Sequence, residues 1–183
     1  MADSPTKFCH GIRLVCDWPE TSDVFFTSVG AALDLIARSD PMRFERVRAT
    51  IRTIGSVPVA PGTDYLWPLR LCSVNIRFFA TPGEDDPQLS VAILASALVR
   101  DATIGHLLDQ GILRTRRNWQ RFDAVCCRQA QLFLHRLGMA RTPWDADLLQ
   151  DLALGEYLSY ALQQLKSVPV VTGRFKMDHQ GSK

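Results

Sequence analysis

The residues of this chain that come closest to a catalytic pattern lie between Leu98 and His106. A helix that carries His-Glu-x-x-His binds zinc through histidines at i and i+4, and its glutamate acts as a general base on metal-bound water. Here the first histidine position holds Arg100, the glutamate position Asp101 and the second histidine position Ile104. A guanidinium is always cationic and a hydrocarbon has no lone pair, so neither can bind zinc. The pattern therefore predicts a zinc-hydrolase helix that has lost its metal and its catalysis.

The histidines elsewhere in the chain do not replace these ligands. A zinc site needs three or four His, Cys or acidic ligands at one point. The chain has four histidines, and no two of them are spaced at i and i+4: His10, His106, His135 and His179. If the helices on either side of Gly111 form an antiparallel hairpin, His106 and His135 lie about 20 Å apart. We therefore expect no metal, no cofactor and no catalytic residue.

Arg100 and Asp101 still need an explanation, because a charged pair in so apolar a helix is costly unless its charges are paired. The register of the same hairpin places Asp101 opposite Arg128, which predicts an interhelical salt bridge that fills the former metal pocket. In the alternative, Arg100 lies at the bottom of an inherited cleft lined by Asp101, Ile104, His106 and Arg128. There its guanidinium would bind a carboxylate or a phosphate through two parallel hydrogen bonds.

Nearby polar and sulfur-containing residues have structural interpretations. We expect His106 to be a boundary histidine held by Asp109 or by Asp123. The five cysteines, in a chain that shows no export signal, predict reduced core thiols rather than disulfides. Cys126 and Cys127 are neighbours on a predicted helix, where successive side chains diverge by about 100°. One of the two should face the core and the other its edge.

Two arginine clusters favour a rival function, nucleic-acid binding. One cluster lies on a short helix after Pro41, and the other surrounds Trp119, so that cations and an aromatic ring could contact phosphate and stack on a base. The clusters consist of Arg43, Arg46, Arg48 and Arg52, and of Arg114, Arg116, Arg117 and Arg121. Acidic residues nearly balance the basic ones, since the net charge is +2. A solvated face is therefore the simpler explanation.

The hydrophobic pattern predicts an α+β fold whose second half is mainly helical. Apolar residues recur at helical spacing in most of the chain, but between residues 54 and 79 they alternate as in strands of a small sheet. The expected helices span about 22–38, 41–51, 88–110 and 118–137, with another from 142. The helix over 88–110 is apolar on nearly all sides and should be central. Residues 1–8 and 167–183 are expected to be flexible tails.

Several parts of the chain resemble one known family. The similarity lies in residues 32–36, 40–48, 69–72, 98–106, 111–112 and 121–126. Together these segments, which span roughly residues 22–140, resemble a family of uncharacterised bacterial zinc metallopeptidases. Members of that family typically read Leu-Val-His-Glu-Ala-Thr-His where this chain reads Leu98 to Ile104. The resemblance implies the fold and the position of a former site, and no catalytic residue.

Length and composition complete the prediction. A chain of 183 residues with 46% apolar residues suits a single domain over 1–183. A cytoplasmic location without membrane contact is the default expectation. We expect a catalytically inactive metallopeptidase-like protein that binds another protein as an inhibitor, immunity-type partner or adaptor. Trp67, Trp119 and Trp144 are candidate anchors if they lie on the surface, and a core position is an equal alternative for each. The alternatives are a nucleic-acid-binding protein and a metal-dependent hydrolase with an unrecognised site.

Overall fold

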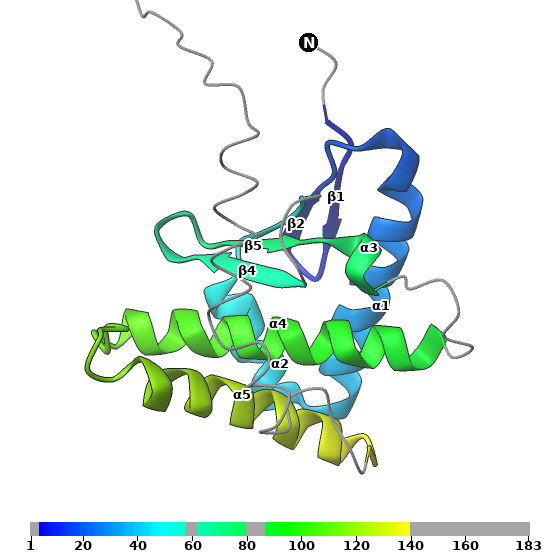
Figure 1. The fold of residues 1–183 in the computed structure, drawn as a ribbon. Coiled ribbons are helices and arrows are strands. Elements are labelled where there is room, and N and C mark those ends of the chain that lie inside the picture. The colour runs from blue at the N-terminus through cyan, green and yellow to red at the C-terminus, as the bar shows by residue number, and fades with distance from the viewer. Residues whose placement is uncertain (1–3, 58–61, 80–86, 140–183) are drawn as a thin grey trace, which may run out of the picture. The chain divides into compact units, whose positions relative to one another are not determined.

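Five strands and five α-helices make up the part of the chain that the structure describes, and the predicted α+β class is confirmed (Figure 1). The structure is a computed structural model that describes residues 4–57, 62–79 and 87–139. These residues all belong to one compact unit, residues 1–151. The helix expected from Thr142, the tail over 167–183 and Trp144 lie outside the described residues.

The sheet is mixed and has the strand order β1-β2-β3-β5-β4. Its strands are β1 (Thr6–Cys9), β2 (Ile12–Val15), β3 (Thr53–Ser56), β4 (Thr63–Leu66) and β5 (Leu71–Val74). The three central strands run parallel, and the edge strands β1 and β4 are each antiparallel to their neighbour. Parallel strands need a crossover, and the two helices between β2 and β3 supply it.

The first two strands correct the expectation of a flexible tail for residues 6–8, which belong to β1, while residues 1–3 lie outside the described residues. β1 and β2 form a hairpin in which Cys9 pairs with Ile12, so the turn consists of two residues only. His10 and Gly11 both have positive φ, 51° and 82°, as a type I′ hairpin turn requires. Ile12 and Leu14 of β2 are buried in the core. β1 is thereby fixed as an edge strand of the sheet.

The segment predicted as strand up to residue 79 ends earlier than expected. β5 stops at Val74, and a short helix, α3 (Ile76–Phe79), follows it. The side-chain oxygen of Asn75 accepts a hydrogen bond from the backbone N–H of Arg77, an Asx turn that competes with the strand. The alternation of polar and apolar residues that suggested a strand is therefore interrupted by the local chemistry of Asn75.

The predicted helices of the first half are confirmed in place and length. They are α1 (Ser22–Ser39) and α2 (Pro41–Thr50), preceded by the 3₁₀ turn η1 (Pro19–Thr21). Asp40 separates α1 from α2, and its carboxylate accepts a hydrogen bond from the backbone N–H of Arg43 at 3.1 Å, an N-cap before a first-position proline. The residues of α1 that face the core are Phe25, Phe26, Val29, Ala32, Leu33 and Ile36.

The carboxylate of Asp40 also joins distant elements. It is fully buried and pairs with the guanidinium of Arg43 and with Arg136 Nη1, the latter at 2.9 Å. Burial alone would raise its pKa, but the hydrogen bonds from Arg43 and Arg136 outweigh burial and lower the pKa of Asp40 below its ordinary value. Asp40 therefore ties the α1–α2 corner to the last described helix.

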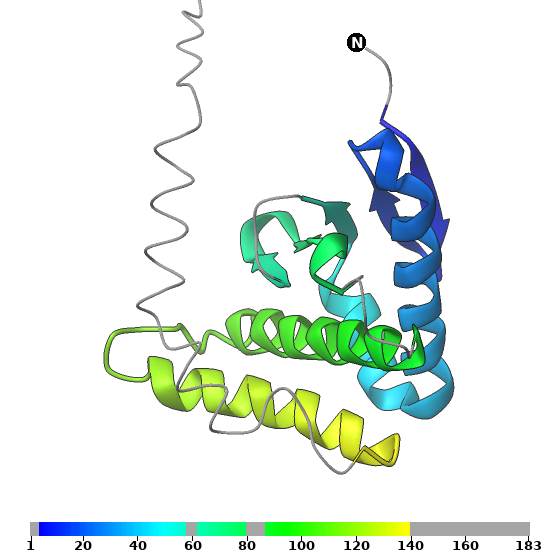
Figure 2. The same cartoon turned by 45° about the vertical axis from the view of Figure 1, so that its right-hand side comes forward.

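The central helix is α4 (Pro87–Asp109), and α5 (Trp119–Arg136) packs along it as the second arm of a hairpin (Figures 1 and 2). α4 also contacts α1, α2 and strand β4, which explains why its sequence is apolar on nearly all sides. Leu94, Ala95 and Leu98 are fully buried there. The stretch Ser90–Asp109 is long and apolar enough to cross a membrane by composition, but most of it is buried inside this fold, as in the core helix of a soluble protein.

Candidate functional site

Asp101 lies in the middle of α4 with its side chain fully buried. Its Oδ1 accepts two hydrogen bonds from Arg100, from Nε at 2.9 Å and from Nη2 at 2.8 Å. Its Oδ2 accepts a hydrogen bond from the thiol of Cys72, on β5, with Sγ at 3.3 Å. Both carboxylate oxygens are thus engaged, so the carboxylate is not presented as a base to an incoming molecule.

Arg100 links α4 to the edge of the sheet. Its Nη2 donates to the backbone oxygen of Thr63 at 2.9 Å and lies 3.2 Å from the Thr63 hydroxyl, on β4. The side chain is 22% exposed, so the guanidinium is largely enclosed. Burial works against the charge, but the Asp101 carboxylate outweighs it and raises the pKa of Arg100, which therefore stays cationic. Arg100 and Asp101 form a neutral, hydrogen-bonded pair between helix and sheet.

This pairing corrects the predicted Asp101–Arg128 salt bridge. Arg128 is exposed on α5, and within residues 4–57, 62–79 and 87–139 it forms no ion pair. Residues at i and i+1 on a helix do not normally face each other. The arginine side chain is long enough for the Arg100 guanidinium to fold back onto Asp101, so the next residue in the sequence is its ion-pair partner.

The remaining predicted site residues, Ile104 and His106, lie on the same helix as Arg100 and Asp101. Ile104 is half-buried and packs against the core, and His106 is also half-buried. A hollow in this part of the fold lies between η1, β3 and α3, lined by residues such as Trp18 and Ser56, and none of the motif positions borders it. Arg100 itself is largely enclosed, with its side chain 22% exposed, so its role at the bottom of a cleft stays a prediction.

The partner of His106 also differs from the prediction. Its Nε2 lies 3.0 Å from the side-chain nitrogen of Gln110, one helical turn later. Asp109 instead accepts a hydrogen bond from Trp67 Nε1 at 2.9 Å and pairs with Arg70. Asp123 pairs with Arg114. Both candidate acids are thus committed to other cations or donors.

The cysteines near this pair are unsuited to nucleophilic chemistry. Cys72, Cys126 and Cys127 are buried and carry free thiols, as predicted for reduced core cysteines. Burial raises the pKa of Cys72 well above its ordinary value, and burial together with the neighbouring Cys127 raises the pKa of Cys126 to about 12. Buried, protonated thiols are poor nucleophiles. Cys126 and Cys127 are both buried, at 1% and 6% exposure.

The two arginine clusters are partly neutralised by nearby acids. Arg114 binds Asp123 with two hydrogen bonds, of 2.9 and 2.6 Å, and Arg48 pairs with Glu45 at 3.1 Å. Arg43 is bound to the buried Asp40. Arg116, Arg117 and Arg121 are exposed, and Trp119 is half-buried. The clusters therefore offer fewer unneutralised cations than their sequence indicates.

Sequence reasoning missed the close contact beside the former motif. Gly105 lies where α4 passes α2 and β4, and a Cβ on it would meet the Thr50 methyl and the Tyr65 ring. The Tyr65 hydroxyl donates a hydrogen bond to the backbone oxygen of Thr50 at 3.1 Å, and burial raises the pKa of Tyr65 to about 12. A glycine inside an apolar helix was the available signal, because such a residue often marks a close approach.

Comparison of the chain with protein-family models, with curated proteins and with solved structures gives no match. The resemblance to zinc metallopeptidases therefore stays a prediction.

Proposed function

We propose that this chain is a non-catalytic protein-binding module on a metallopeptidase-like frame. The observation that carries the proposal is the Arg100–Asp101 pair at the positions where a His-Glu-x-x-His helix holds a ligand and its general base. A cation there repels Zn²⁺, and Ile104 offers no ligand atom. Asp101 is held by two hydrogen bonds from Arg100 and one from Cys72. The site's residues stabilise the fold and leave no base for hydrolysis.

An exposed apolar surface supplies the contact region. It lies at the C-terminal end of α4, where Trp67 of the 3₁₀ turn η2 (Trp67–Leu69) is hydrogen-bonded to Asp109, and it includes exposed residues of the loop that follows α4. We call it the Trp67 patch; its residues and exposed fractions are Leu66 42%, Trp67 39%, Leu69 67%, Ile112 45% and Leu113 56%. Exposed apolar residues that gather in one region are typical of protein-binding surfaces.

The two halves of the Trp67 patch are held together by Asp109. Trp67 donates its Nε1–H to Asp109 at 2.9 Å, and Arg70 pairs with the same carboxylate at 3.3 Å. The loop after α4 is fixed by the hydrogen bond from the Ile112 N–H to the Leu107 oxygen at 2.9 Å. A tryptophan that is held in place before binding loses little conformational entropy in the complex, which suits an anchor.

The charges around the patch indicate the chemistry of the partner. Arg70 and Arg114 are paired with Asp109 and Asp123, whereas Arg116 and Arg117, in the loop after α4, are exposed and form no ion pair among the described residues. A positive rim attracts a partner of opposite charge and discriminates against basic surfaces. The proposed partner is a protein whose apolar contact surface is bordered by aspartate and glutamate, and the chain would act on it as an inhibitor, immunity-type partner or adaptor.

The proposal is tested by charge substitutions within the patch. The double variant Leu69→Asp/Leu113→Asp is expected to lose a stoichiometric partner that the wild-type chain retains in size-exclusion chromatography, and binding should weaken at least about 100-fold, as for hot-spot residues. Met42→Asp is the matched control, because Met42 is 82% exposed on α2, outside the patch. That variant should bind like the wild type, and equal loss in both variants would contradict the proposal.

Two other results would replace the proposed function. Zinc-dependent peptide hydrolysis by the purified chain that disappears in Asp101→Asn would show that the former motif is active. Salt-sensitive binding to single-stranded DNA that is lost in Arg116→Ala/Arg117→Ala would favour the nucleic-acid alternative. Both assays use the full chain, with Met42→Asp again as the control.

A further inference from the structure

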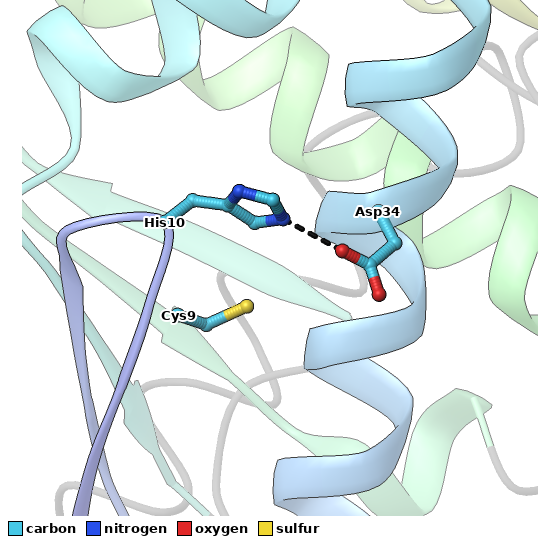
Figure 3. A group of neighbouring side chains, drawn as sticks. All are labelled: Cys9, His10 and Asp34. Atoms are coloured by element: carbon cyan, nitrogen blue, oxygen red, sulfur yellow. Dashed lines mark hydrogen bonds and ion pairs between the residues drawn. The ribbon is translucent and has the colours of Figure 1, made fainter.

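Three side chains of different chemistry meet between the β1–β2 turn and α1, far in sequence from the former motif. They are Cys9, His10 and Asp34, and their ligand atoms all lie within 4.8 Å of one another. Figure 3 shows the sulfur of Cys9, the imidazole of His10 and the carboxylate of Asp34 directed toward one another across the gap between turn and helix. We infer that this group is a Zn²⁺ site.

The present distances are close to those that a zinc ion needs. His10 Nε2 lies 2.6 Å from Asp34 Oδ1. With zinc bonds of about 2.3 Å to sulfur and about 2.1 Å to nitrogen and oxygen, tetrahedral donors lie about 3.3–3.6 Å apart. An ion that replaces the hydrogen between His10 and Asp34 therefore separates these two side chains by less than about 1 Å. The sulfur of Cys9 needs to approach by a similar amount at most.

The backbone and an aromatic ring hold two of the ligands in place. Cys9 ends β1 opposite Ile12, and His10 occupies the left-handed position of the turn with φ 51°. The His10 ring packs edge-on against Phe44, with centroids 4.9 Å apart, so the imidazole orientation is fixed from α2. Asp34 belongs to α1. The ligands thus come from the β1–β2 turn and from α1, two elements far apart in the sequence.

Access and ligand type favour zinc over harder cations. The side chains of His10 and Asp34 are 34% and 55% exposed, so an ion can reach them from solvent, while Cys9 is partly buried behind them. A thiolate and an imidazole select zinc, whereas Mg²⁺ and Ca²⁺ prefer all-oxygen sites. Binding releases the thiol proton of Cys9 to solvent and displaces the hydrogen between His10 Nε2 and Asp34, so that the neutral imidazole bound through Nε2 carries its one proton on Nδ1. Three protein ligands leave a fourth position for water.

This site is independent of the proposed protein-binding function. It shares no residue with the Arg100–Asp101 pair or with the Trp67 patch, and its ion would join the β1–β2 turn to α1. The metal content of the purified chain alone therefore does not bear on the α4 motif. Substitutions are needed to assign a bound ion to Cys9, His10 and Asp34.

The experiment titrates Zn²⁺ into the full metal-free chain under reducing conditions, by calorimetry with native mass spectrometry for stoichiometry. The variants are Cys9→Ser, His10→Asn and Asp34→Asn, in which asparagine at position 10 tolerates the left-handed turn. His106→Asn is the matched control, a half-buried histidine on another element. We expect one ion per chain in the wild type and the control. Each ligand variant should lose affinity at least about 100-fold, because even the loss of a group that only hydrogen-bonds to a metal ligand costs about 10–100-fold.

Cobalt gives a readout that reports on the sulfur directly. The Co²⁺-loaded wild type should show a thiolate-to-metal charge-transfer band that persists in His106→Asn and is absent in Cys9→Ser. Mg²⁺ should not displace the bound Co²⁺. The inference is overturned if the wild type binds no zinc, or if Cys9→Ser and His10→Asn bind it as tightly as the wild type. Circular dichroism of the metal-free variants, expected to match the wild type, separates a lost ligand from a lost fold.

Discussion

Arg100→Leu is the substitution that best tests the assignment of the former motif to structure. In the wild type, Arg100 donates two hydrogen bonds to the fully buried Asp101 carboxylate. After the substitution, the hydrogen bond of the Cys72 thiol, at 3.3 Å, is the remaining one to that carboxylate among the described residues. Thr63 also loses a donor to its backbone oxygen. A buried charge would then be left without its counterion.

The expected cost follows from this geometry. Removal of one partner of a buried ion pair costs about 3–5 kcal/mol, and the 22% exposure of the Arg100 side chain places this case near about 3 kcal/mol. Asp101→Asn in the Arg100→Leu background removes the orphaned charge, so the double variant should recover part of the loss. The coupling energy of the cycle should be at least about 2 kcal/mol. Arg128→Leu should change stability by less than about 0.5 kcal/mol, because Arg128 is exposed.

The assay is urea unfolding at pH 7, followed by far-ultraviolet circular dichroism, for the wild type, both single variants, the double variant and Arg128→Leu. Fits give the free energy of unfolding and its urea dependence for each protein. A coupling energy below about 0.5 kcal/mol, the level seen for independent sites, would refute the structural role of the pair. So would an Arg128→Leu effect as large as that of Arg100→Leu.

Three further changes probe the fold around the site. Asp40→Asn should lower the free energy of unfolding by about 2 kcal/mol at pH 7, because it removes charged hydrogen bonds. Since the pKa of Asp40 is lowered in the folded protein, this contribution is present above about pH 4 and is lost as the pH falls through the folded pKa. The unfolding free energies of the wild type and the variant should therefore converge in acid, and a widening difference would contradict this direction. Gly105→Ala should lower stability by about 1–3 kcal/mol, because its Cβ would lie 2.6 Å from Tyr65 Cε1. Gly30→Ala is the control, since the space around Gly30 is open, and it should raise stability by about 0.5–1 kcal/mol. Equal melting temperatures for the two variants would refute the crowding at Gly105. Tyr65→Phe should cost about 1–2 kcal/mol in the same thermal assay, since it leaves the Thr50 carbonyl without its donor, and an unchanged melting temperature would argue against that bond.

Local sequence signals predicted α1, α2, α4 and α5 well, whereas α3 was expected to be strand. Asp40-Pro41 combines an N-cap carboxylate with a first-position proline, and α2 begins there. The apolar spacing over 22–38 and the continuous apolar run over 88–110 correspond to α1 and α4. These features depend on residues within one or two turns of each other, which a sequence pattern represents directly.

What the sequence did not predict depends on turns and on contacts between distant residues. His10-Gly11 is a two-residue turn between short strands, but β1 has an exposed face and therefore shows little hydrophobic alternation. The Arg100–Asp101 pair depends on one side-chain rotamer, which spacing does not determine. The approach of Asp34 to Cys9 and His10 joins residues 24 or more positions apart, and no local pattern encodes it.

The position of β1 at the edge of the sheet has a consequence for local stability. β1 pairs with β2 alone, three of its four residues are exposed, and Phe8 is 73% exposed. Its detachment would expose little additional apolar surface, whereas α4 cannot open without disrupting its contacts with α1, α2, β4 and α5. Amide hydrogens of β1 should therefore exchange with solvent through local opening events, while those in the middle of α4 exchange only when the whole unit unfolds.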